Sequence, residues 1–277
     1  MMHQKTVLIL LIIHLCFSFQ SVAQGDLLVT PTRVVFEDNK QKEELSLLNM
    51  GQDTATYSIS FVQRSMKEDG SFVTIVQPDS GQMFADPYLR IFPRTVTLAP
   101  REPQVILLQF RRKADMVAGE YRSHLYFRSE QNYKPLGMEK SSNDSTLLNV
   151  QLTPIFGVSI PIIIRAGSVQ VSSNLSDLNL ETLPSSVQNI KFTIHRTGNI
   201  SLYGDITVEF IPDQGKSCQV GIVAGVGVYT GISKRYMVIK LKDPSGKMLE
   251  KGKLRVLYTS KGDGKQVVYA TGDYTIK

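Results

Sequence analysis

Few residues of this chain have the types and spacing that enzyme chemistry or metal binding requires. His124 and His195 each lie among strand-forming residues, with no cysteine or acidic cluster near them in the sequence. Cys218 has no neighbouring base that would activate its thiol. We find no nucleophile elbow and no prominent pair of carboxylates. We therefore expect a protein that is not an enzyme, with no catalytic residue, no cofactor and no metal.

Two glycine-containing stretches also lack the pattern of a nucleotide site. Gly215-Lys216-Ser217 is similar to the end of a phosphate-binding loop, but Phe210 stands where that motif needs a glycine. The stretch from Gly221 to Gly231 has several glycines without the cofactor spacing or a following helix. We interpret it as a flexible hairpin or loop.

The stretch whose spacing does suggest a function runs from Leu147 to Arg165. Leu148, Val150 and Leu152 alternate with polar residues, so they point to one face of a strand. The rest of the stretch is almost wholly apolar, and it contains two prolines, which cannot donate hydrogen bonds within a sheet. This composition predicts that part of the stretch lies at a sheet edge or a bend.

An apolar edge strand is an aggregation hazard, and proteins that keep one often use it to pair with a partner's strand. Strand addition of this kind combines backbone hydrogen bonds with alternating side-chain contacts. Leu148, Val150 and Leu152 are our candidate donor residues. The alternative is that these three side chains fill the core of their own domain.

The first residues indicate export. Lys5 provides a positive start, Val7 to Phe19 an apolar core, and Ser21-Val22-Ala23 a cleavage site of small residues. We predict a signal peptide over residues 1–23 and a mature chain that begins at Gln24. No later stretch is long and apolar enough to cross a bilayer, so we do not expect an integral membrane protein.

The charge distribution argues against a nucleic-acid partner, and the cysteine content excludes an intramolecular disulfide in the mature chain. The net charge is +6, but the basic residues are scattered and lack the interleaved aromatics of single-strand binders, so no nucleic-acid partner is expected. Only Cys218 remains after removal of the signal peptide, so no intramolecular disulfide can form in the mature chain.

Period-two segments recur throughout the chain and predict an all-β fold. The strands expected in the first half are Leu27–Phe36, Glu43–Asn49, Ala55–Val62, Tyr88–Leu98, Gln104–Phe110, Tyr121–Arg128 and Leu147–Arg165. Those expected in the second half are Ser168–Ser172, Asn189–Arg196, Gly204–Ile211, Met237–Lys242, Leu254–Thr259 and Gln266–Tyr274. With a short linker at Ala166-Gly167, this predicts two tandem immunoglobulin-like β-sandwich domains over residues 24–165 and 166–277.

Two local features refine the first domain. Tyr121 opens the sixth strand and resembles the corner tyrosine of such sandwiches, which bonds back to nearby backbone; an ordinary half-buried strand tyrosine is the alternative. The stretch from Ser129 to Thr146 is polar and rich in turn formers, and we expect a long mobile loop there.

Two such domains behind a signal peptide, together with an ordered set of matches, resemble the periplasmic pilus assembly chaperones of the chaperone–usher pathway. The matches are Thr32-Arg33-Val34-Val35-Phe36, Leu45-Ser46-Leu47-Leu48-Asn49, Val96-Thr97-Leu98-Ala99-Pro100, Gln104 to Phe110 and Glu120 to Arg128. The resemblance extends over Leu27 to Arg165 and is weak beyond it.

The resemblance implies a periplasmic chaperone that binds and caps pilin-like secreted subunits by donor-strand complementation, with a cleft between its two domains. In this family the seventh strand of the first domain completes a subunit's sandwich, and Leu148, Val150 and Leu152 are the matching donors. The implied partners are pilin-like or other secreted β-rich subunits and an outer-membrane usher. A self-capping dimer through the same apolar edge is a further expectation.

The family also anchors the subunit's C-terminal carboxylate between an arginine and a lysine. Arg33 matches the arginine, and its guanidinium fork suits a carboxylate. The lysine is missing, because Ser159 or Pro161 stands in its place. Arg33 is then either the subunit carboxylate anchor or a surface or interdomain arginine. The alternative function is an immunoglobulin-like surface, adhesion or structural module that binds protein or glycan.

Overall fold

The computed structural model describes residues 27–37, 39–130, 155–184, 186–244, 246–261 and 266–276, and almost all of its regular structure is β-strand. The strands of the first half are β1 (Leu27–Thr30), β2 (Val34–Phe36), β3 (Lys42–Asn49), β4 (Ala55–Met66), β5 (Phe72–Ile75), β6 (Leu89–Phe92), β7 (Thr95–Leu98), β8 (Pro103–Phe110), β9 (Gly119–Glu130) and β10 (Gly157–Ala166), with a 3-10 helix, η1 (Asp86–Tyr88). Those of the second half are β11 (Val171–Thr182), β12 (Gln188–Gly198), β13 (Leu202–Pro212), β14 (Cys218–Val228), β15 (Lys234–Lys240), β16 (Gly252–Ser260) and β17 (Val268–Ile276).

The first half is a sandwich of two sheets. One sheet has the strand order β1-β3-β8-β6, and the other has the order β2-β10-β9-β4-β5 with β7 also paired to β4. Alternating residues of the facing strands, such as Leu45 and Leu47 in β3 and Ile106 and Leu108 in β8, are fully buried between the sheets. This strand arrangement confirms the predicted immunoglobulin-like fold.

The corner tyrosine is confirmed as well. Tyr121 is 5% exposed, and its hydroxyl donates a hydrogen bond to the backbone oxygen of Val117, four residues upstream, at 3.1 Å. This contact fixes the turn that leads into β9.

Prolines divide two of the predicted strands. Leu27–Phe36 is not one strand, because the chain crosses at Pro31 from β1 in one sheet to β2 in the other. Tyr88–Leu98 is likewise divided at Pro93 into β6 and β7, which also pair in different sheets. Proline removes a ladder hydrogen bond, and at these two positions the chain changes sheets. The short strand β5 has mostly exposed residues, and our strand prediction missed it.

The second half forms its own sandwich, with a three-stranded sheet β11-β12-β15 and a four-stranded sheet β14-β13-β16-β17. Its core is separate from the first and includes Ile190, Ile206, Val256 and Tyr258. Of the predicted strand Ser168–Ser172, only the last two residues are strand, and they begin the longer β11.

The prediction of a flexible hairpin or loop at Gly221–Gly231 is wrong. Residues up to Val228 belong to β14, which pairs with β13 along its length. Gly225 has a φ of +70°, lies at a register shift in the ladder, and its N–H donates to Asp205 Oδ1 at 2.7 Å. The glycine therefore accommodates a bulge in a strand rather than a flexible loop.

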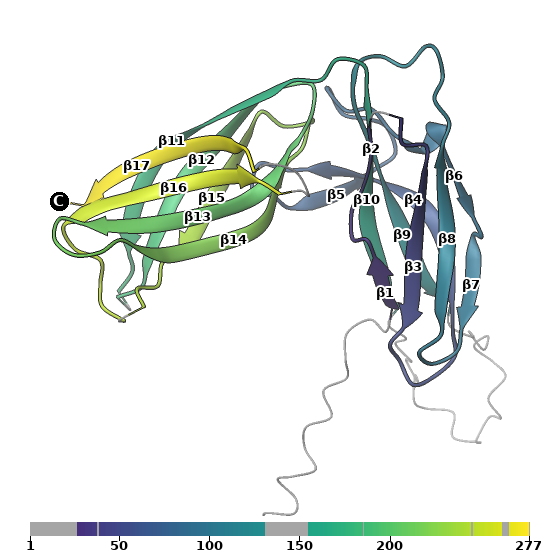
Figure 1. The fold of residues 1–277 in the computed structure, drawn as a ribbon, viewed down its shortest axis with the longest axis horizontal. Coiled ribbons are helices and arrows are strands. Elements are labelled where there is room, and N and C mark those ends of the chain that lie inside the picture. Colours follow the sequence, from purple (N-terminus) through teal and green to yellow (C-terminus); the bar gives the residue numbers. More distant parts are fainter. Residues whose placement is uncertain are drawn as a thin grey trace, which may run out of the picture.

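The two sandwiches meet at an angle, and the hairpin of β4 and β5 lies between them (Figure 1). At the tip of this hairpin, the backbone oxygen of Glu68 accepts a hydrogen bond from the N–H of Tyr236 in β15, at 2.7 Å. The ring of Phe72 in β5 lies 5.4 Å from the ring of Tyr229, centroid to centroid. The first sandwich thus contacts both the edge strand β15 and the loop before it.

Several predicted features lie outside the described residues: the signal peptide at 1–23, most of the loop at Ser129–Thr146, and the N-terminal part of Leu147–Arg165. Within the described ranges, no helix has the length and apolar character needed to span a membrane.

Candidate functional site

The candidate site is the edge of β10, the described part of the predicted donor strand. The donor residues Leu148, Val150 and Leu152 lie outside the described residues, so their position is not tested. The described chain resumes at Ile155, and β10 begins at Gly157.

β10 is paired along its full length on one side only. β9 pairs antiparallel with every residue from Gly157 to Ala166. On the other side, β2 pairs in parallel with residues 162–164 alone, through the register Ile162 with Val34 to Ile164 with Phe36. In the described chain, residues 157–161 therefore have no strand partner on that side. This half of β10 is an open sheet edge.

An apolar stripe runs along β10 and out of the core. Ile164 and Ile162 are fully buried, and Ile160 is 3% exposed. Val158 is only partly buried, and Phe156 is 47% exposed. Because side chains alternate along a strand, these even-numbered residues share one face. The stripe therefore passes from the core of its own domain into solvent over the open half of the strand.

Arg33 lies where the open edge ends. It directly precedes Val34, whose partner is Ile162, so it is level with Pro161 on β10. Its guanidinium carbon lies 4.3 Å from the ring centroid of Tyr203, a residue of the second sandwich. Pro161, one of the two residues that could stand in the place of the family's lysine, thus lies level with Arg33.

The charge of Arg33 is not neutralised by a direct ion pair in the described part of the chain. Burial, and next the nearby charge of Arg122, lower the pKa of Arg33 to about 10. The side chain therefore remains a cation at neutral pH, partly withdrawn from water at the junction of the two sandwiches. Such a guanidinium favours an anionic partner.

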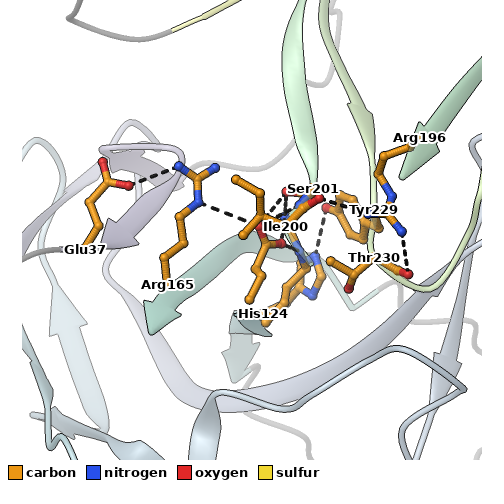
Figure 2. A network of polar contacts seen from close by, with 10 residues as sticks. Glu37, His124, Arg165, Arg196, Ile200, Ser201, Tyr229 and Thr230 are labelled. Carbon is orange, nitrogen blue, oxygen red and sulfur yellow. Dashed lines mark hydrogen bonds and ion pairs between the residues drawn. The ribbon is translucent and has the colours of Figure 1, made fainter. Parts of the chain in front are cut away.

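Beside Arg33, a buried ion pair of the first sandwich forms hydrogen bonds with the second sandwich. Glu120 and Arg122 lie two residues apart on β9, so they share a face, and Arg122 Nη2 donates to Glu120 Oε1 at 2.6 Å. Arg122 Nη2 also donates to Ser201 Oγ at 2.7 Å. The backbone oxygen of Asn199 accepts a hydrogen bond from the N–H of Glu120 at 3.0 Å. Figure 2 shows Ser201 within this network.

The network keeps both members of the pair charged. Burial alone would raise the pKa of Glu120, but Arg122 and the hydrogen bonds from Ser201 outweigh it and hold the pKa below its usual value. Burial alone would lower the pKa of Arg122, but Glu120 outweighs that effect and raises it. Arg165 lies on the outer side of the network, where its Nη1 pairs with Glu37 Oε2 at 3.0 Å (Figure 2).

The loops that contact the first sandwich are themselves held by one arginine of the second. Arg196 donates to the backbone oxygens of Gly198, Ile200, Thr230 and Ile232, at 2.8 to 3.1 Å. Figure 2 shows Arg196 beside Thr230. Our sequence reading missed this network. Glu120 lies just before the predicted strand Tyr121–Arg128, and the partners of the Glu120-x-Arg122 pair are about eighty residues away, so no local pattern points to them.

Comparison with known proteins gives structural similarities only. No protein-family model and no curated protein matches the chain. Among solved structures, it is similar to the Pseudomonas aeruginosa CupB2 chaperone, with 15% identity over 90% of this chain and 100% of that chain at a TM-score of 0.41. It is similar to the E. coli chaperone DraB, with 14% identity over 92% of this chain and 98% of that chain at a TM-score of 0.41.

A third similar structure is the CsuC-CsuE chaperone–tip adhesion subunit pre-assembly complex from archaic chaperone-usher Csu pili of Acinetobacter baumannii. The identity is 12% over 88% of this chain and 97% of the matched chain, at a TM-score of 0.46. At these identities and TM-scores the similarity does not assign a function, so the function of this chain has to be inferred from its own residues.

Proposed function

We propose that this protein is a non-enzymatic periplasmic chaperone that caps pilin-like secreted subunits by adding its own strand to their incomplete sheets. The observation that supports this most is the half-paired β10, whose apolar stripe changes from 0% exposure at Ile162 to 47% at Phe156. A client that lacks an edge strand gains both the backbone partners and the apolar side chains at this edge.

The sequence extends the same stripe. Leu148, Val150 and Leu152 are even-numbered like Phe156 and Val158, so in a continuous extended strand they would lie on the same face. In this proposal, residues near the core end of β10 anchor the strand in its own domain. The residues farther toward the N-terminus fill the client's core.

Arg33 gives the client strand a direction. β2 runs parallel to β10 and blocks the edge beyond Pro161. A client strand parallel to β10 would therefore end beside Arg33, and its terminal carboxylate would meet the cation. An antiparallel strand would bring an amino terminus or a neutral backbone there. The carboxylate role of Arg33 is thus consistent with a parallel client strand.

The proposal is tested by co-purification from the periplasm, with mass spectrometry of the bound proteins. The triple variant Leu148→Asp, Val150→Asp, Leu152→Asp should lose small β-rich secreted subunits that the wild type retains. Val238→Asp is the matched control, because Val238 is 58% exposed on the second sandwich. Equal recovery with the triple variant, in a protein that remains folded, would refute strand donation and favour an adhesion or structural module.

Two further partners belong to the same proposal. An outer-membrane usher would receive the client, and two free molecules would cap each other through the open edge of β10. Light scattering at high protein concentration tests self-capping. A wild-type protein that stays monomeric would contradict it.

A further inference from the structure

A small crevice lies between the two sandwiches, apart from the open edge of β10. Arg64 in β4 and Arg122 in β9 line it from the first sandwich, together with Gln82. Tyr229 and Thr230, in the loop after β14, line it from the second. The cavity measures about 10 Å³, close to the space that one water-sized particle needs.

The walls of the crevice are cationic and incompletely bonded. Arg122 is 8% exposed, and its Nε and Nη2 are bonded to Glu120 and Ser201, but its buried Nη1 has no hydrogen-bond partner in the described chain. The buried Nε of Arg64 also lacks one. No carboxylate lines the crevice. A buried donor left without an acceptor is unfavourable, and two such donors here belong to cations.

Two contacts hold the guanidinium of Arg122 in place. Its guanidinium carbon lies 3.7 Å from the ring centroid of Tyr229, and the ion pair with Glu120 holds its opposite side. The neighbouring His124 adds no positive charge at neutral pH, because burial, followed by Arg122 and Arg64, lowers its pKa to about 3. Burial is the larger cause, and the positive charges of the two arginines add to it.

We propose that a monatomic anion, chloride under ordinary conditions, binds in this crevice between Arg122 Nη1 and Arg64 Nε. The two unpaired arginine donors suit an acceptor without protons, and the neighbouring Gln82 and Thr230 are polar. The small volume selects against phosphate and sulfate. Because Arg64 and Arg122 belong to one sandwich and Thr230 to the other, the bound anion would tie the two together.

Bromide is the probe, because it replaces chloride and is visible by anomalous scattering. Crystals grown in sodium bromide, measured at the bromine edge, should have an anomalous peak between Arg122 and Arg64. Arg64→Gln should abolish the peak, whereas Arg94→Gln, at an exposed arginine of the first sandwich, should leave it unchanged. No peak in the wild type would overturn the proposal in favour of a water, and an equal peak in Arg64→Gln would overturn it by showing that Arg64 does not hold the anion.

A solution measurement gives an independent answer. At a bromide concentration ten times the dissociation constant, the melting temperature of the wild type should be about 3–6 °C higher in sodium bromide than in sodium gluconate of the same ionic strength, measured by calorimetry. The rise should vanish in Arg64→Gln and persist in Arg94→Gln. Equal rises in all three proteins would mean that bromide acts elsewhere, and the site would be rejected.

Discussion

Glu120 of the first sandwich and Ser201 of the second are joined by two hydrogen bonds, since the N–H and the hydroxyl of Ser201 both donate to Glu120 Oε2, at 3.0 and 2.7 Å. The same carboxylate neutralises Arg122, so one buried side chain serves both an ion pair and the junction of the domains. Arg33, the proposed anchor for a client carboxylate, depends on this junction, because its guanidinium lies over Tyr203 of the second sandwich.

Removal of Glu120 should therefore destabilise the protein strongly. Glu120→Ala leaves the charge of Arg122 buried and unpaired, which should lower the free energy of unfolding by about 3–5 kcal/mol. Ser201→Ala should cost less, about 1–3 kcal/mol, because it removes a hydroxyl and keeps the ion pair. Urea unfolding measures both. Glu130→Ala is the control, because the contacts of Glu130, an ion pair with Arg128 and a hydrogen bond from Ser58, are exposed. An equal loss in Glu120→Ala and Glu130→Ala would contradict the assignment.

His124 should give the stability of the protein a distinct pH dependence. Its pKa is lowered to about 3 in the folded protein, whereas it protonates near 6.5 when unfolded. Between these values the unfolded chain binds the extra proton, so the stabilisation is complete above pH 6.5 and is lost as the pH falls toward 3.

The slope due to His124 should approach 1.4 kcal/mol per pH unit, roughly the free energy of one unit of pKa. Urea unfolding of the wild type and of His124→Gln between pH 7 and pH 4 measures it. The free energy of unfolding should fall less steeply in the variant. Identical slopes would mean that His124 is accessible to protons in the folded state.

Gly70, at the tip of the hairpin of β4 and β5, should not tolerate a side chain. Its φ is +85°, and an added Cβ would overlap the guanidinium of Arg235, which donates to the backbone oxygen of Gly227. Gly246 has a similar φ of +75° with open space around it. Gly246→Ala should therefore cost about 1 kcal/mol from backbone strain alone, and Gly70→Ala about 1–3 kcal/mol more. Equal losses in calorimetry would show that the contact with Arg235 is unimportant.

Arg33 should matter only for clients with a free terminal carboxylate. Arg33→Gln should weaken binding of a client's last-strand peptide about tenfold to a hundredfold, the range expected for a charge-assisted hydrogen bond. The amidated peptide should bind wild type and variant equally. Tyr203→Leu removes the ring that stacks on Arg33 and keeps the Arg33 guanidinium, so it separates the effect of stacking from that of charge. Isothermal titration measures the affinity of each protein for each peptide. If Arg33→Gln still prefers the peptide with a free carboxylate, Arg33 is not the anchor.

The sequence was sufficient to predict the fold because alternation is local. Glu43–Asn49 and Asn189–Arg196 each have a period-two pattern because one face of the strand is buried. The pattern is therefore present within the sequence of each strand. It could not indicate that Pro31 moves the chain from one sheet to another. It also gave the wrong structure for Gly221–Gly231, since a glycine at a bulge resembles a glycine in a loop.

The candidate site was predictable only in part. The apolar alternation and Arg33 were visible in the sequence. That β2 pairs with only residues 162–164 of β10 is a property of strand register across the chain. The junction of Glu120 with Ser201 and the crevice between Arg64 and Arg122 depend on contacts between the two sandwiches, and neither leaves a periodic pattern.

The most direct test of strand donation is site-specific photo-crosslinking from the open edge. Benzoylphenylalanine can replace Phe156, because this side chain is 47% exposed beside the unpaired half of β10 and leaves room for the added benzoyl group. The control position is Phe92, which is 77% exposed on the other sheet. We predict that secreted β-rich subunits are crosslinked in the periplasm from position 156 and not from position 92. Subunits crosslinked only from position 92, or from neither position although they co-purify, would contradict donation of this strand.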